Sequence, residues 1–259
     1  MEILRLKLEN IGRSFHDRLI LIGHYVCFFY QSLTYADKKF FSQLRYSLVQ
    51  QGTDSLGLMF LSSMFIGLVL ALQGYVTLTR FGAEQALGQL IAMSMIRELG
   101  PVMCSLVFIG RSCTTITSEL ALMRIAMQID SLEVIGINPM ARLVAPRLWA
   151  VLIVAPALIS IFIAVAIFSG GAISVGVLGV DYGSFWSNIT STVKFYDDVV
   201  KSLLKGLIFF FCAVAIAIYQ GYFVAPRIEA VAKATTRTVV LSFALTLALD
   251  FILTSFTVH

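Results

Sequence analysis

Five long apolar segments, separated by short charged stretches, constrain this chain more than any other feature. A helix rises about 1.5 Å per residue, so each segment can cross a hydrocarbon core of about 30 Å. Charged residues make up only 13% of the chain, against about 25% in a soluble domain, so lipid must solvate much of the surface. The sequence therefore predicts an all-α integral membrane protein with five transmembrane helices. They are expected at 55–79, 99–118 (the helix beginning near 86), 148–178, 199–224 and 236–258.

The first 50 residues predict a helix of a different kind. With basic flanks and charged residues on its other faces, this amphipathic helix is expected to lie in the cytoplasmic interface rather than to cross the bilayer. An ordinary helix packed on a soluble domain is the alternative. The chain thus divides into an interfacial region, 1–50, and a transmembrane domain, 51–259. The apolar positions at helical spacing are Leu4, Leu8, Ile11, Phe15, Leu19, Ile22 and Val26.

The distribution of Lys and Arg predicts the orientation. If the N-terminus is cytoplasmic, the cytoplasmic parts are 1–54, 111–147 and 225–238, and they hold seven, four and three positive residues, fourteen of the nineteen. Cytoplasmic loops carry such an excess of positive charge. Five crossings then place the C-terminus on the periplasmic side.

Polar groups inside the apolar segments are candidates for function, because an ionisable group at membrane depth costs several kcal/mol. Gln73 needs a polar partner in that setting. Arg97 and Glu98 precede Gly100-Pro101, which favours a bend, and they could contact a lipid head group or form a structural ion pair. Asp250 is the single acid that we assign to the interior of a span. It is expected to pair with a neighbouring helix rather than to relay protons.

Two further patterns concern helix contacts. Small residues on one face of the first span (Ser63, Gly67, Ala71 and Gly74) let another helix approach closely, either in a second copy or in the same subunit. The third segment is longer than a bilayer requires and predicts a tilt or a bend near Gly170-Gly171.

The segment 119–137 predicts a short cytoplasmic helix along the membrane, with Pro139 beyond its end. A helix held between two spans could transmit force from a partner that grips it. A plain interfacial loop helix is the alternative. The polar surface of segment 119–137, together with Met123, supplies the candidate coupling residues Glu119, Met123, Arg124, Gln128, Asp130 and Glu133.

The sequence carries none of three common catalytic signatures. The chain has no GxxxxGK[ST] phosphate loop, no GxSxG and no HExxH. Its three histidines and four scattered cysteines match no metal or disulfide spacing. We therefore predict a protein that is not an enzyme, with no catalytic residue, no metal and no cofactor of its own. Any ATP it uses, with Mg²⁺, would be bound by another subunit.

Several distinctive motifs follow one another along the chain. They are Gly67 with Leu72 to Tyr75, Glu98-Leu99-Gly100-Pro101, Gly110-Arg111, Glu119 with Met123-Arg124, Gln128 to Glu133, Asn138-Pro139, Ala234 to Arg237, and Asp250 with Leu253-Thr254. In this order they resemble the MlaE family of permeases, which belong to ABC transporters serving MCE-protein lipid transport systems. The resemblance covers about residue 50 to the end. The departures Ile109, Ser118, Ala121 and Ala126-Met127 fall around the predicted cytoplasmic helix and bear on its fit to an ATPase.

This resemblance implies a set of partners in the bacterial inner membrane. It implies a homodimer, two cytoplasmic ABC ATPase subunits gripping 119–137 as a coupling helix, a STAS-domain protein on the ATPase and a periplasmic hexameric MCE protein. No nucleic acid is expected. A phospholipid cavity would open outward between the two subunits, lined by Leu70, Gln73, Val76, Thr77, Leu78, Phe81, Arg97, Glu98 and Leu99.

The predicted function is that of the permease subunit of an ABC transporter that moves phospholipids between inner and outer membranes and maintains outer-membrane lipid asymmetry. One alternative keeps the fold and changes the cargo to a sterol or another hydrophobic molecule. A second is a non-transporting scaffold for an MCE protein. A third, a proton-coupled carrier, is disfavoured because we count only one intramembrane acid.

Overall fold

A computed structural model describes residues 40–258 of the chain, with side chains described over 41–256. Over these residues it contains helices and no strand, and five helices are long and apolar enough to cross a membrane. The predicted all-α fold with five spans is confirmed. The predicted N-terminal amphipathic helix, with its apolar positions from Leu4 to Val26, lies outside the described residues. The spans are Phe41–Thr79, Glu84–Ile125, Met140–Gly176, Phe195–Tyr222 and Ile228–Phe256.

Short π-helical segments interrupt the first two of these spans and begin the third and fourth. The first span consists of α2 (Phe40–Leu48), the π-helical segment η1 (Val49–Thr53) and α3 (Asp54–Thr79). The second begins with the short 3₁₀ turn η2 (Glu84–Ala86) and carries two π-helical segments, η3 and η4. Its remaining elements are α4 (Leu87–Ser94), η3 (Met95–Leu99), α5 (Gly100–Phe108), η4 (Ile109–Cys113) and α6 (Thr114–Ile125).

The second half of the chain supplies three spans and one shorter helix. The third span is η5 (Met140–Val144) followed by α8 (Ala145–Gly176). A helix outside the five spans, α9 (Tyr182–Thr192), leads to the fourth, which is η6 (Phe195–Val200) and α10 (Lys201–Tyr222). The fifth span lies in α11 (Ile228–Val258). Asp181 caps α9, because its side chain accepts a hydrogen bond from the Ser184 amide at 2.7 Å.

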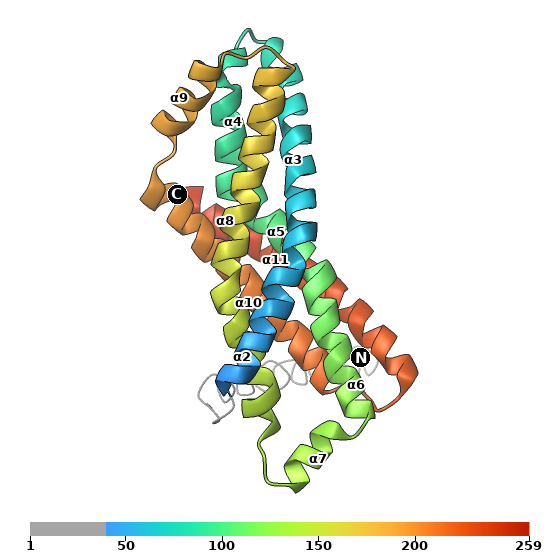
Figure 1. Cartoon of the computed structure of the whole chain (residues 1–259). Coiled ribbons are helices and arrows are strands. Elements are labelled where there is room, and N and C mark those ends of the chain that lie inside the picture. The colour runs from blue at the N-terminus through green and yellow to red at the C-terminus, as the bar shows by residue number, and fades with distance from the viewer. Residues whose placement is uncertain (1–39, 259) are drawn as a thin grey trace, which may run out of the picture.

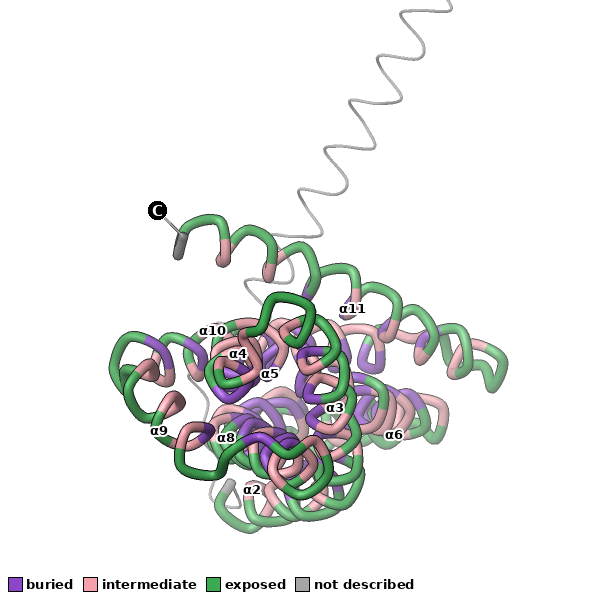
Figure 2. Tube along the Cα trace, turned by 90° about the horizontal axis from the view of Figure 1, so that it is seen from above, coloured by how far each residue is buried: buried purple, intermediate pink, exposed green. Residues whose placement is uncertain are grey.

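The helices form an upright column that spreads at one end. Figure 1 shows α3, α4 and α8 running together through the upper half, while α6, α10 and α11 diverge below them. The short helix α7 (Gln128–Val134) projects at the bottom. We call this the α7 end, predicted to be cytoplasmic, and the opposite one the α9 end. Viewed from above, α11 lies along one side of the helix bundle and is exposed (green) over most of its length (Figure 2).

The small-residue face of α3 packs inside the same chain. Ser63, Gly67, Ala71 and Gly74 are all buried. A Cβ on Gly67 would collide with the Ala166 carbonyl on α8, so this glycine allows the two backbones to approach closely. The pattern could indicate a contact with a second copy or with the same subunit, and the structure shows the contact within the same subunit.

The pair Gly170-Gly171 serves packing as well. Helix α8 runs from Ala145 to Gly176 without interruption, so the chain does not break there. A Cβ on Gly170 would come 3.1 Å from the Gly67 carbonyl, and one on Gly171 would come 3.0 Å from the Phe185 ring of α9. These glycines therefore admit α3 and α9 to the surface of α8.

A single helix over 119–137 was the wrong prediction. Residues 119–125 continue α6, and only Gln128–Val134 form the separate helix α7. Met127 causes the break, because it adopts a left-handed conformation with φ 54° that no helix continues through. Gly136, with φ 76°, lies just beyond α7 in the conformation that favours glycine.

Candidate lipid site and partner surfaces

Arg97 lies in η3, where the second span meets the beginning of the fourth. Its Nε donates to Asp198 Oδ1 at 2.8 Å, and the second oxygen of Asp198 accepts the Lys194 amide at 2.8 Å. Asp198 is only 4% exposed, whereas the Arg97 side chain is 55% exposed. Asp198 therefore anchors the Arg97 guanidinium while more than half of the Arg97 side chain stays exposed.

Lys205 joins three spans beside this pair. Its Nζ donates to Glu98 Oε2 at 2.9 Å and to Thr254 Oγ1 at 2.8 Å, and it lies 2.6 Å from Asp250 Oδ1. The Thr254 hydroxyl also donates to Glu98, at 3.0 Å. One lysine on α10 thus links η3 of the second span to α11 of the fifth.

These contacts confirm one prediction about Asp250 and contradict another. Asp250 pairs with a neighbouring helix, as expected. Its description as the single acid inside a span is wrong, because Glu98 and Asp198 also lie within the second and fourth spans. Each of these three carboxylates has a cationic partner.

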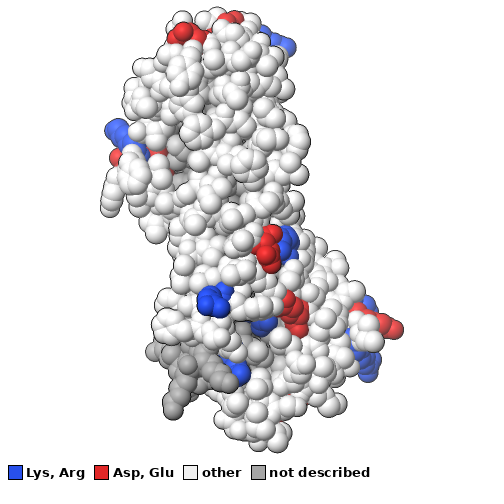
Figure 3. Space-filling model, viewed as in Figure 1, with Lys and Arg blue, Asp and Glu red and all other residues white. Residues whose placement is uncertain are grey.

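A cavity of about 560 Å³ opens between η3, α10 and α11 at this cluster. Its lining combines ionic and apolar side chains, as a site for an amphiphilic ligand requires. The mixed group of blue and red atoms on the left edge of Figure 3 lies near the turn between α9 and α10. The lining residues are Arg97, Glu98, Asp197, Asp198, Lys201, Ser202, Leu204, Lys205, Ile208, Leu253 and Thr254.

The other predicted lipid contacts lie on the upper half of α3 and beyond its end. Gln73, Val76, Thr77 and Phe81 are exposed, whereas Leu70 and Leu78 are half-buried against the core. Leu99 also packs against the core. The described ion pairs of Arg97 and Glu98 are made with η6 and α10. Within one chain, the predicted set therefore forms two surfaces, an α3 strip and the ionic cavity.

A second polar network lies toward the α7 end. Arg147 on α8, whose side chain is 8% exposed, donates to Glu119 Oε2 at 3.1 Å and to the Leu143 carbonyl at 3.2 Å. Gln50 in η1 donates to the other oxygen of Glu119. Glu119, a predicted coupling residue, thus joins α6 to the first and third spans.

Arg111 extends this network within η1, α3 and η4. Its Nη1 donates to the Gln50 carbonyl at 3.1 Å and to the Ser55 hydroxyl at 3.2 Å. The Ser55 hydroxyl lies 2.9 Å from that of Ser112. The Arg111 guanidinium is 3.8 Å from Asp54.

The remaining coupling candidates lie at or near the tip of the α7 end. Arg124 pairs with Asp130 at 2.7 Å across the turn before α7. Gln128 and Glu133 are exposed, whereas Met123 packs against the core. Large apolar side chains are exposed beside them: Met127 66%, Val134 88% and Ile135 66%. This apolar and charged tip, Arg124 to Ile135, has the composition of a protein-docking surface.

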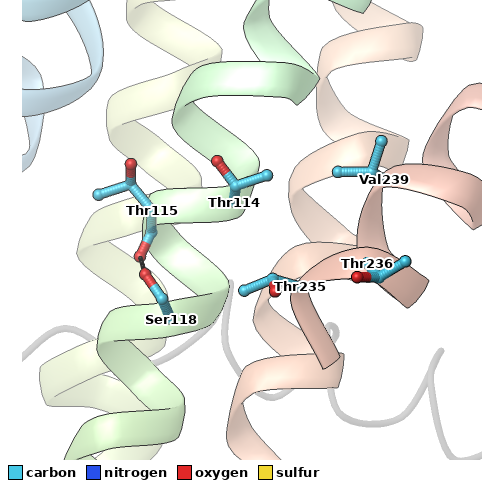
Figure 4. Close-up of a pocket in the computed structure, with 6 residues that line it drawn as sticks. All are labelled: Thr114, Thr115, Ser118, Thr235, Thr236 and Val239. Atoms are coloured by element: carbon cyan, nitrogen blue, oxygen red, sulfur yellow. Dashed lines mark hydrogen bonds between the residues drawn. The ribbon is translucent and has the colours of Figure 1, made fainter. Parts of the chain in front are cut away.

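A groove of about 360 Å³ separates α6 from α11. Figure 4 shows short hydroxyl side chains from both helices along it. These hydroxyls donate to backbone carbonyls of their own helices, as Thr114 does to Gly110 and Thr236 to Ala232, each at 2.9 Å. The groove is consequently lined by short side chains whose hydroxyl groups already donate hydrogen bonds to nearby backbone carbonyls. The lining residues are Thr114, Thr115, Ser118, Thr235, Thr236 and Val239.

Sequence reasoning missed Asp198 and did not assign Lys205 to the site. A signal was available for both, because each is an ionisable residue at or inside an apolar segment and needs a partner there. The partner itself could not be found from spacing, since Arg97 and Asp198 are 101 residues apart. Within 40–258 no group of three or more His, Cys, Asp or Glu side chains could hold a metal ion.

Over the described residues, five spans, an ionic cavity within them and an exposed short helix at one end define a polytopic helical membrane protein. The chain belongs to the Permease MlaE family, whose model matches residues 44–256.

Curated relatives agree with this assignment. The chain is 45% identical over 204 residues to the intermembrane phospholipid transport system permease protein MlaE of Haemophilus influenzae, covering 79% of this chain and 78% of that protein. It is 35% identical over 205 residues to a probable ABC transporter permease protein of Rickettsia prowazekii, covering 78% of each. It is 29% identical over 209 residues to the chloroplastic protein TRIGALACTOSYLDIACYLGLYCEROL 1 of Arabidopsis thaliana, covering 81% of this chain and 59% of that protein.

Proposed function

We propose that this chain is the permease subunit of an inner-membrane ABC transporter that moves phospholipids between the inner and outer membranes and so maintains outer-membrane lipid asymmetry. The observation that carries the proposal is the 45% identity, over 79% of the chain, to a phospholipid transport permease. The ionic cavity supports it independently, because an amphiphile needs charged groups for its head and apolar surface for its chains.

The lipid would use both surfaces of the predicted site. Arg97 keeps an exposed guanidinium near the phosphate position, while the exposed α3 strip offers Val76 and Phe81 to acyl chains and Gln73 to the head group. A second copy of the chain would bring its own strip and cavity opposite these, which would close one chamber from surfaces that a single chain keeps apart.

Homodimerisation through α11 and the α6–α11 groove would build that chamber. Only 11% of the apolar window of α11 is buried within the chain, against 28% to 50% in the other four spans. The short hydroxyl side chains of the groove would let a helix of the second copy approach closely.

ATP would be bound and hydrolysed, with Mg²⁺, by a separate cytoplasmic ATPase dimer. The exposed tip from Arg124 to Ile135 would seat in that ATPase, placing the N-terminus in the cytoplasm and the C-terminus in the periplasm. The α7 helix follows α6 directly, so movement of the tip would shift the second span and alter the cavity. A STAS-domain protein on the ATPase and a hexameric MCE protein over the α9 end would complete the assembly.

Purification from the native membrane in mild detergent, with mass spectrometry of everything bound, tests this proposal. We expect an ATPase, an MCE protein and phospholipid. A bound sterol would contradict the cargo and favour the first alternative. Isolation without any ATPase would contradict the transporter and favour a scaffold or a carrier.

A further inference from the structure

We propose that the ionic cavity between η3, α10 and α11 selects a zwitterionic head group that carries a primary amine, a phosphodiester of the ethanolamine type. This inference rests on the proposed function and specifies its substrate class. At about 560 Å³ the cavity is within the range of about 300–1,000 Å³ that is usual for small-molecule sites.

The charges of the lining suit a zwitterion. Three cationic side chains, Arg97, Lys201 and Lys205, face the same space as three acidic ones, Glu98, Asp197 and Asp198. An anionic head group would have to compete with these carboxylates for the cations that they already pair with, and it would offer the carboxylates no new partner. A zwitterion offers each sign a counterpart.

The exposed charged side chains of the cavity include both cations and carboxylates. The Arg97 and Lys201 side chains are 55% and 56% exposed, and those of Glu98 and Asp197 are 44% and 56% exposed. Asp198 and Lys205 are nearly buried, at 4% and 10%, and hold the others in place. Two cations can therefore reach a phosphate while two carboxylates reach an ammonium group.

Ser202 supplies an unused polar atom at the cavity wall. The residue is 2% exposed, and its hydroxyl has no hydrogen-bond partner among the described residues. A buried hydroxyl that lacks a partner is destabilising, so such groups in native proteins have an explanation. A phosphate oxygen or an ammonium N–H bound in the cavity would satisfy it.

The lining also favours a primary amine over a quaternary one. Quaternary ammonium groups are recognised by aromatic faces, and no aromatic side chain lines this cavity. Carboxylates instead accept N–H hydrogen bonds, which a primary ammonium donates and a quaternary one cannot. Leu204, Ile208 and Leu253 provide apolar surface for the glycerol backbone and the first methylenes.

The test uses the assembled transporter in vesicles that contain equal amounts of phosphatidylethanolamine and phosphatidylglycerol. Lipid that remains bound after extraction is quantified by mass spectrometry. We expect enrichment of phosphatidylethanolamine over phosphatidylglycerol by about tenfold. In Glu98→Gln/Asp197→Asn the enrichment should be lost, because the cations remain and the amine partners are gone. Asp197→Asn alone, in an exposed helical ion pair, should lower it without affecting folding.

Glu84→Gln is the matched control, since Glu84 lies in η2, outside the cavity; its enrichment should equal that of the parent protein. Bound phospholipids at the input ratio would overturn this inference and leave the proposed function standing, whereas no bound phospholipid would overturn both. Displacement of bound phosphatidylethanolamine by soluble phosphoethanolamine would support the head-group assignment, because the soluble compound carries the same phosphate and primary amine.

Discussion

The two polar networks of this molecule differ in what their charges can reach. Toward the α7 end, Arg147 is buried and Glu119 is occupied by Arg147 and Gln50. In the ionic cavity, Arg97 and Glu98 each have a partner, yet their side chains are 55% and 44% exposed. We therefore interpret the network toward the α7 end as one that stabilises the packing of the spans, and the ionic cavity as a binding site.

The difference teaches that an ion pair in a span is not by itself evidence of function. Both networks connect three spans, and both satisfy costly ionic groups. In the cavity, exposed charged side chains lie beside apolar surface and a hydroxyl that has no hydrogen-bond partner among the described residues, whereas the most exposed charge of the α7-end network, Asp54, lies 3.8 Å from Arg111. Substitutions in the α7-end network should therefore affect stability first, and those in the cavity should affect lipid handling first.

Arg147→Met should have the largest effect. It would leave Glu119 without its cationic partner in a half-buried position, and loss of one partner from a buried pair costs about 3–5 kcal/mol. We expect a large fall in the unfolding temperature of the purified protein in detergent. Arg124→Met, which breaks an exposed pair, is the control and should cost at most about 1 kcal/mol. Equal falls in the unfolding temperature for the two variants would contradict a stabilising role of the α7-end network.

Lys205→Met should have the next largest effect, chiefly on transport. It removes the cation that links Glu98 to Asp250, so α11 would keep only the Thr254–Glu98 hydrogen bond of its described polar ties to η3. Because Glu98 can still reach water, the unfolding temperature should fall less than in Arg147→Met. Lipid transfer by the assembled transporter should drop by about tenfold or more. Lys205→Met/Asp250→Asn should restore stability but not transfer; recovery of transfer would contradict a role in lipid handling.

Arg124→Glu should weaken association with the ATPase. It places a negative charge beside Asp130 on the exposed tip, and the isolated protein should lose less than about 1 kcal/mol, because surface pairs contribute little. The measurement is the amount of ATPase that co-purifies. Arg227→Glu, exposed at the same end but outside the tip, is the matched control. Undiminished co-purification would place the docking surface elsewhere.

Gln73→Leu should have the smallest effect. Gln73 is exposed on α3, so folding and assembly should be unchanged, while lipid transfer should fall by about two- to threefold. Gln89→Leu, an exposed glutamine on α4, controls for general polarity. Identical transfer rates for the two variants would remove the α3 strip from the lipid path.

The sequence predicted the five spans because hydrophobic length is sufficient to identify a membrane helix. It also found Arg97, Glu98 and Asp250 as charges that need partners. The partners could not be predicted, since Lys205 and Asp198 approach them only when the fourth span packs on the second. The division of 119–137 escaped as well, because Met127 adopts a left-handed conformation that its residue type does not announce.

ATP-dependent lipid transfer is the measurement that tests the central claim most directly. The chain, assembled with its ATPase in donor vesicles that hold a fluorescent phospholipid, is supplied with acceptor vesicles, and transfer is followed with and without ATP and in the presence of an uncoupler. We predict transfer that requires ATP hydrolysis and is insensitive to the uncoupler. Transfer that proceeds equally without ATP, or that stops with the uncoupler while ATP hydrolysis continues, would contradict the account.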